Sequence, residues 1–191
     1  MEDVLGFIVL NLRRGELECP AELLKIRIPG DWVVRPGASK ADELKALEGI
    51  MADELKTPIH FTQREVEREV IVAKGRYQFH ALGDIPHERA VYLTTEALAL
   101  NQNGGGGSGS LREMLDWLSD RVNRVVIDDT GPPNERIQWH DHLMYQAEEL
   151  GADTESGRAL RKRLLENVSK QTSLTFDPER RKVKVWFISR D

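Results

Sequence analysis

The chain has 191 residues and a net charge of -5, which arises from 27 lysine and arginine residues against 32 aspartate and glutamate residues. The length allows one large domain or two small ones, and the interspersed charges exclude the concentrated basic stripe that binds phosphate backbones, so nucleic acid is not an expected partner. The single cysteine, Cys19, excludes a disulfide within one chain and a thiolate-rich metal site. The longest apolar run, Val4 to Leu10, is shorter than the roughly 20 residues that cross a bilayer, so no membrane insertion of this segment is expected.

The clearest helix prediction in the first half begins after Ser39, an N-cap residue with Asp42 three positions later. Apolar residues then recur at helical spacing and form one stripe: Leu44, Leu47, Ile50, Met51 and Leu55. The next apolar pattern, from Ile59 to Phe79, predicts a strand. In it Val66, Val70 and Val72 share one face and Glu65, Glu67 and Glu69 share the other, because side chains alternate along a strand.

Residues 104–110, GGGGSGS, have the composition of an engineered Gly/Ser linker. On that interpretation the chain consists of a first α+β half, 1–103, and a second α+β half, 111–191, which pack together as one domain. The alternative is a natural glycine-rich loop. A flexible segment of this length requires the residues that flank it to lie near each other.

The second half opens with Ser110 and Glu113, a capping-box pattern at the start of a helix. Strands are predicted around Val126 and Trp139, and a second helix over residues 158–172. The two helical stripes are Leu111, Leu115, Leu118 and Val122 in the first helix, and Leu160, Leu164 and Val168 in the second. The closing stretch, 174–190, is predicted to form a hairpin of two strands joined by a turn.

Three stretches share one order, in which a helix is followed by a short polar link and then by a strand. They are IMADELKTPIHF, WLSDRVNRVVID and NVSKQTSLTF. This order predicts an α+β fold made of repeated helix-strand units, with the helices packed on a mostly antiparallel sheet.

The stretch LREMLDWLSDRVNRVVIDDTGPPNERIQWH resembles a segment of the Soli-type family of uncharacterised bacterial extracytoplasmic proteins. In that family a helix precedes a VVD-x-TG-like turn and an aromatic-containing strand, and here Val126, Thr130, Gly131 and Trp139 take those places, with Asp128 or Asp129 as the acid. The stretches LEGIMADELKTPIHFTQREVEREVIVAKG and RKRLLENVSKQTSLTFDPERRKVKVWFISRD are similar to the family's earlier helix-strand segment and to its ending. The resemblance implies a location in the bacterial cell envelope, outside the cytoplasm, and supplies no catalytic residue.

His140 and His142 form the most metal-like pattern, because alternation along a strand puts both imidazoles on one face. A metal site needs a third ligand, and the remaining histidines and Cys19 show no ligand spacing. Two hypotheses therefore stay open here: an ordinary polar strand end, and a metal-assisted hydrolase or sensor-accessory domain that uses this pair.

Two acidic patterns also allow a chemical interpretation. Glu65, Glu67 and Glu69 could act as paired carboxylates, but carboxylates that alternate with valines are typical of a solvated strand face. Asp128 and Asp129 could coordinate a cation, but Asp followed by Gly131 is typical of a turn.

The sequence therefore favours a non-enzymatic binding or assembly module, without a cofactor, that acts through a sheet face or an exposed strand edge. The expected partner is a protein, a peptide or a second copy of the chain. The candidate contact face lies on the closing strand, opposite Val183, Val185 and Phe187. Its residues are Lys182, Lys184, Trp186 and Ile188.

Overall fold

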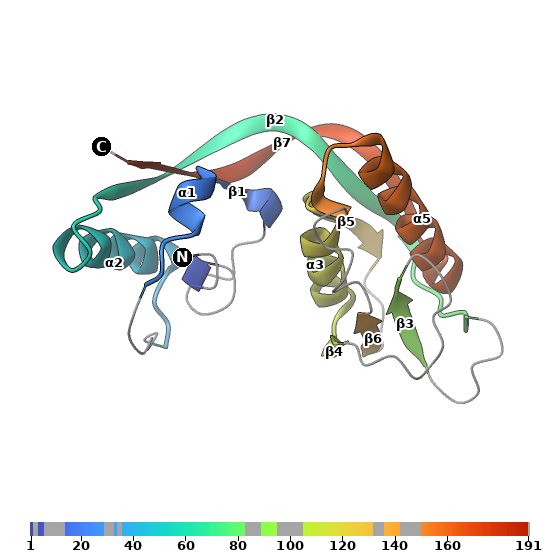
Figure 1. Ribbon diagram of the computed structural model, residues 1–191. Coiled ribbons are helices and arrows are strands. Elements are labelled where there is room, and N and C mark those ends of the chain that lie inside the picture. The colour runs from blue at the N-terminus through green and yellow to red at the C-terminus, as the bar shows by residue number, and fades with distance from the viewer. Residues whose placement is uncertain are drawn as a thin grey trace. The chain divides into compact units, whose positions relative to one another are not determined.

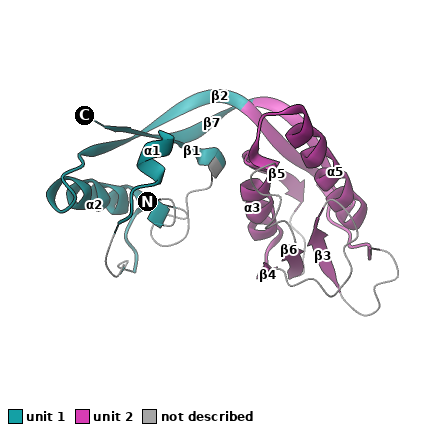
Figure 2. Ribbon diagram, viewed as in Figure 1, with its two compact units in different colours: residues 1–68, 181–191 teal, residues 69–180 magenta. Residues whose placement is uncertain are grey.

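The computed structural model describes residues 1, 4–5, 14–28, 33, 36–82, 89–94, 105–131, 136–141 and 150–190. The fold is α+β, with helices packed against strands of two mixed sheets (Figure 1). The chain forms two compact units, Met1–Arg68 with Arg181–Asp191, and Glu69–Arg180 (Figure 2). This division differs from the predicted halves, 1–103 and 111–191, because the chain passes from one unit to the other inside two long strands.

Unit 1 contains the 3-10 helix η2 (Arg14–Glu16), strand β1 (Leu17–Glu18), and helices α1 (Ala21–Leu24) and α2 (Lys40–Asp53). It also holds the first part of β2 (Ile59–Arg76) and the last part of β7 (Thr175–Arg190). Ser39 caps α2 as predicted, since its hydroxyl accepts a hydrogen bond of 3.2 Å from the main chain of Asp42. The core of unit 1 buries Leu44, Leu47 and Met51 of α2 with Ile59 and Ile188. Ile50, also predicted in the stripe, is 36% exposed.

Unit 2 contains helices α3 (Leu111–Val122) and α5 (Glu155–Thr172), with strands β3 (Ala90–Leu93), β4 (Gly105–Gly109), β5 (Val126–Gly131) and β6 (Ile137–Asp141). The predicted capping box at Ser110 and Glu113 is present. Every residue of the two predicted helical stripes is at most 4% exposed and belongs to the core of this unit. Sequence periodicity therefore located the apolar faces of both helices.

The sheets are mixed rather than mostly antiparallel. The four-stranded sheet has the order β1-β7-β2-β5 and the three-stranded sheet the order β3-β6-β4. The pairs β1–β7, β2–β5 and β3–β6 are parallel, and β4–β6 is antiparallel. The chain between β2 and β5 includes α3, and a crossover of this kind brings the second strand back in the same direction as the first.

The closing stretch is one strand, β7, and the predicted hairpin is wrong. β7 is a neighbour of β2 in the sheet, and the two strands are 16 and 18 residues long, so the main chain around Asp177 and Pro178 has a strand beside it. Lys74 of β2 reinforces this segment, because its ammonium lies 2.6 Å from a carboxylate oxygen of Glu179 and 3.4 Å from one of Asp177. Asp177 and Pro178 are therefore exposed positions within a long strand and not part of a turn.

Residues 105–109, which lie within the predicted linker, form strand β4. They pair with β6 over five positions, from Gly105 opposite Asp141 to Gly109 opposite Ile137. A Cβ atom at Gly107 would collide with the indole ring of Trp139, and one at Gly106 would collide with the main chain of Trp139. Side chains larger than that of glycine do not fit here, because the strand lies so close to its neighbours. The interpretation of residues 104–110 as an engineered linker stays a prediction.

Candidate functional site

A cavity of about 430 Å³ lies within unit 2, lined by helix α5 and by parts of β2 and β7. Its apolar lining comes from Ile71, Leu165, Phe176 and Pro178. Its basic lining comes from Arg124, Arg158, Arg161 and Lys162. An apolar surface beside several cations is the pattern of a site for a ligand that carries both an apolar group and an anion. We call this cavity the arginine pocket.

The pocket's arginines are positioned by two helix ends. Arg161 and Lys162 follow Arg158 by three and four residues, about one helical turn, so all three project from one side of α5. The N-terminus of α5 is fixed by Thr154, whose hydroxyl accepts a hydrogen bond of 3.0 Å from the main chain of Gly157. Arg124 directly follows the C-cap of α3, where Asn123 adopts a left-handed conformation with φ 49°.

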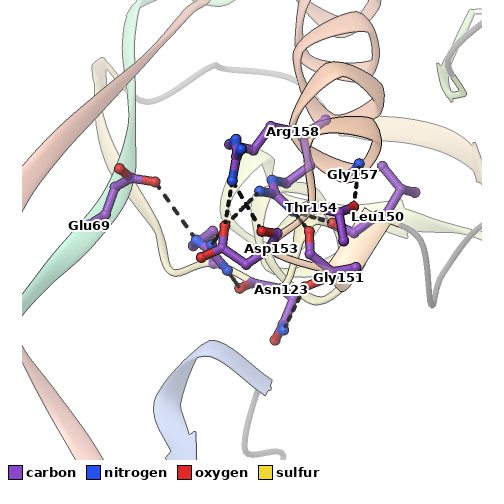
Figure 3. Close-up of polar contacts among 11 residues, drawn as sticks. Glu69, Asn123, Leu150, Gly151, Asp153, Thr154, Gly157 and Arg158 are labelled. Atoms are coloured by element: carbon purple, nitrogen blue, oxygen red, sulfur yellow. Dashed lines mark hydrogen bonds and ion pairs between the residues drawn. The ribbon is translucent and has the colours of Figure 1, made fainter.

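Three guanidinium groups surround one carboxylate oxygen of Asp153. The distances from Oδ1 are 3.4 Å to Arg124, 3.5 Å to Arg158 and 3.7 Å to Arg161. Charge-assisted hydrogen bonds are typically about 2.7 to 2.9 Å long, so all three contacts are loose. Figure 3 shows Asp153 beside Arg158 and the start of α5, with Glu69 approaching from β2. The Asp153 side chain is 75% exposed, which leaves it open to replacement by another anion.

Arg161 anchors this arrangement. Its side chain is only 8% exposed, and its Nη1 atom donates hydrogen bonds of 2.6 Å to the main-chain oxygen of Leu150 and 2.8 Å to that of Ala152. Burial, and then the positive charge of Arg124, lower the pKa of Arg161 below its ordinary value. An arginine nevertheless stays charged in proteins, so a positive charge is held in a partly dehydrated place.

The pocket carries more positive than negative charge. Its four lining cations face two lining carboxylates, Glu69 and Glu166, and the neighbouring Asp153. Glu69 lies 3.9 Å from Arg124, and Glu166 lies 3.9 Å from Lys162. These ion pairs are long and the acids are exposed, so they compensate the arginines weakly.

The four residues of the predicted contact face on β7 differ in their exposure to solvent. Lys182 and Lys184 are exposed, whereas Ile188 is 4% exposed and belongs to the core of unit 1. Trp186 is half-buried and packs against the same core, opposite Leu17 of β1. Ile188 packs in the same core as Leu44, Leu47 and Met51 of α2, which supply a second layer on this side of the strand. A binding role for this face stays a prediction, and its two lysines are the exposed members.

His140 lies half-buried in β6, with its ring centroid 5.2 Å from that of Tyr92. His142 lies outside the described residues, so the predicted pair stays a prediction. Within the described part of the chain, no group of three or more His, Cys, Asp or Glu side chains could hold a metal ion.

The acidic residues considered above lie on strands β2 and β5. Glu65, Glu67 and Glu69 are exposed, as a solvated strand face requires. Asp128 lies in β5 rather than in a turn, and its carboxylate accepts hydrogen bonds from the main chain (3.1 Å) and hydroxyl (2.7 Å) of Thr130.

The sequence alone did not predict the arginine pocket. The basic run at Arg158, Arg161 and Lys162 has helical spacing, and that signal could have marked one side of α5 as cationic. Nothing in the sequence brings Arg124, more than thirty residues earlier, to the same carboxylate.

The chain matches no protein-family model, no curated protein and no solved structure. The resemblance to the Soli-type family therefore stays a prediction. Among the residues described, no helix has the length and apolar character needed to span a bilayer.

Proposed function

We propose that the protein is a binding module without enzymatic activity, and that it captures an acidic segment of a partner protein in the arginine pocket. The observation that carries this proposal is the convergence of Arg124, Arg158 and Arg161 on Asp153 beside an apolar cavity. The resemblance described above adds the location: the partner is expected outside the cytoplasm, in the bacterial cell envelope.

The lining of the pocket favours a peptide segment over a bare anion. A carboxylate of the ligand can accept hydrogen bonds from the arginines, each worth about 1.5 to 3 kcal/mol when one partner is charged. A neighbouring apolar side chain can bury itself against Leu165 and Phe176. The volume of about 430 Å³ falls within the range of specific ligand sites and suits one or two side chains.

The test uses fluorescence anisotropy with a short fluorescein-labelled peptide that alternates Asp with Leu. The matched control peptide has Asn in place of each Asp, which keeps size and polarity but removes the charge. We expect the Asp peptide to bind and the Asn peptide to bind at least about tenfold more weakly, a difference of ~1.4 kcal/mol.

Two variants test whether the Asp peptide binds in the arginine pocket. Arg158→Gln removes the most exposed of the three arginines, 60% exposed in its side chain, and should weaken binding of the Asp peptide about five- to tenfold. Arg112→Gln removes an exposed arginine of α3 that does not line the pocket, and should leave binding unchanged. Equal affinity for the two peptides, or equal effects of the two variants, would show that the pocket does not recognise an acidic segment.

A further inference from the structure

The three guanidinium groups of the arginine pocket face a single oxygen atom of Asp153. The nitrogen atoms nearest to Oδ1 are Nη2 of Arg124 at 3.4 Å, Nη1 of Arg158 at 3.5 Å and Nη2 of Arg161 at 3.7 Å. An ionised carboxylate has about four lone-pair sites on two oxygens, so Oδ1 offers about two sites to three guanidinium groups. The carboxylate therefore matches the number of donors around it poorly.

Main-chain oxygens hold the three guanidinium groups in place. Arg161 donates two hydrogen bonds, of 2.6 and 2.8 Å, to main-chain oxygens in the segment before α5. Arg124 donates one of 2.9 Å to the main-chain oxygen of Asn123, and Arg158 donates one of 3.1 Å to that of Asp153. These hydrogen bonds do not involve the side chain of Asp153, so the arrangement of the arginines does not depend on its carboxylate.

Positive charge is concentrated where the three arginines meet. The side chains of Arg161 and Arg124 are 8% and 22% exposed. Burial lowers the pKa of Arg161, and the positive charge of Arg124 lowers it further, so these two cations repel each other. A carboxylate brings one negative charge to this place, whereas a phosphate monoester carries about -1.5 to -2 near pH 7.

We propose that the acidic group recognised by the arginine pocket is a phosphorylated serine of the partner segment, whose phosphate takes the place of the Asp153 carboxylate. This inference rests on the proposed function and names the chemical class of its ligand. A phosphate monoester presents three acceptor oxygens, one for each guanidinium group, and it forms charge-assisted hydrogen bonds with clusters of arginine.

The apolar lining favours a phosphorylated segment over free phosphate. Leu165 and Phe176 line the same cavity of about 430 Å³. A side chain next to the phosphoserine can bury apolar surface there, and inorganic phosphate has no apolar group to bury. A phosphorylated peptide should therefore bind more tightly than inorganic phosphate.

The test is fluorescence anisotropy with three labelled peptides of one sequence. They differ at one central position between leucines, which is phosphoserine, Asp or Asn. At pH 7.5 we expect the phosphoserine peptide to bind at least about tenfold more tightly than the Asp peptide. Unlabelled inorganic phosphate should displace the phosphoserine peptide only at concentrations at least about a hundredfold above the dissociation constant of that peptide.

A change of pH separates the phosphate from the carboxylate. The second pKa of a phosphate monoester is about 6, and the ordinary pKa of an Asp carboxyl is about 3.9. Lowering the pH from about 7.5 to about 5.5 protonates the free phosphate and should narrow the advantage of the phosphoserine peptide over the Asp peptide. Histidine ordinarily titrates in this range, and the described lining of the pocket contains none. The charged side chains that face the ligand are Arg124, Arg158, Arg161, Lys162, Glu69, Glu166 and Asp153.

Two substitutions test the role of the three arginines. Arg124→Gln removes one of the three donors and should reduce the ratio of the two peptide affinities at least about threefold. The matched control, Lys162→Gln, removes the same charge from a lining residue that pairs with Glu166, and should change the ratio less than about twofold.

Each failure has its own meaning. Equal affinity for the phosphoserine and Asp peptides would overturn this inference and leave the proposed function intact, because that function depends on the difference between Asp and Asn. Displacement by inorganic phosphate near the dissociation constant of the peptide, an advantage that does not change with pH, or equal effects of the two substitutions would also overturn it. Equally weak binding of all three peptides would overturn both. The peptide comparison uses the unmodified chain, so the inference stays testable if Arg124→Gln does not fold.

Discussion

The carboxylate of Asp153 already forms ion pairs with the three arginines that an acidic ligand would bind. Its carboxylate is loosely held, at 3.4 to 3.7 Å from three guanidinium groups, and it competes with an acidic ligand for them. Asp153→Asn keeps the size of the side chain and removes its charge, so the affinity for the Asp-Leu peptide should rise about threefold to tenfold. This corresponds to ~0.7 to 1.4 kcal/mol, as expected for exposed ion pairs.

The matched control for this change is Glu155→Gln, which removes an exposed acid two residues away in the first turn of α5. It alters the net charge by the same amount and should raise the peptide affinity less than twofold. If both substitutions raise the affinity equally, the effect comes from net charge, and Asp153 does not occupy the site.

Two neighbouring residues of β7 test which face of the strand is buried. Val185 is 0% exposed and Lys184 is exposed. Val185→Asp places an unpaired charge in the interior and should lower the free energy of unfolding by more than about 3 kcal/mol, whereas Lys184→Asp should change it by less than about 0.5 kcal/mol. Urea denaturation followed by circular dichroism measures both values. Similar losses in the two variants would contradict the burial of this strand.

Strand β4 shows how one element depends on the absence of side chains. Gly107→Ala forces a methyl group against the Trp139 ring, which is 3% exposed and has no room to move freely. Overpacking of this kind typically costs about 1 to 3 kcal/mol, and thermal unfolding should show that loss. Gly131→Ala serves as the control, because nothing lies within 4 Å of the added Cβ and stability should change little or rise slightly. Equal stability of the two variants would mean that β4 does not pack on Trp139.

The elements differ in how far the sequence determined them. The apolar stripes of α3 and α5 follow from helical periodicity, and the Ser110–Glu113 cap follows from a local pattern. The continuity of β7 through Pro178 depends on a neighbouring strand and on Lys74, about a hundred residues earlier. β4 depends on a close approach to Trp139, which composition cannot reveal. The local signals for helix caps and helical stripes were therefore reliable, whereas the local turn signal at Asp177 and Pro178 was overridden by long-range contacts that one sequence does not reveal.

Long-range contacts also decide which residues of β7 are buried and where the two units begin and end. The exposure of Lys184 and the burial of Val185 follow from alternation along a strand, but the burial of Ile188 required knowledge of the layer supplied by α2. The two units, whose boundaries fall inside β2 and β7, also lie beyond sequence patterns, because a chain that leaves one unit and returns to it has no linker to mark the boundary.

The net charge of the whole molecule is negative, whereas the lining of the arginine pocket is mainly positive. The chain has a net charge of -5, so it repels an acidic peptide at long range, while Arg124, Arg158 and Arg161 attract it at contact. Salt screens long-range interactions between exposed charges more than contacts that are partly buried. When NaCl is raised from about 50 mM to about 500 mM, the Debye length falls well below 10 Å, and the association rate constant of the Asp-Leu peptide should stay constant or rise.

The dissociation rate constant should rise over the same range, because screening weakens the arginine contacts in the complex. Stopped-flow anisotropy separates the two rate constants, and Arg158→Gln should mimic salt by raising dissociation while leaving association within about twofold. A steep fall of the association rate constant with salt would indicate long-range attraction. Such attraction would need a basic surface elsewhere, and the exposed lysines of β7, Lys182 and Lys184, would then be the first residues to substitute.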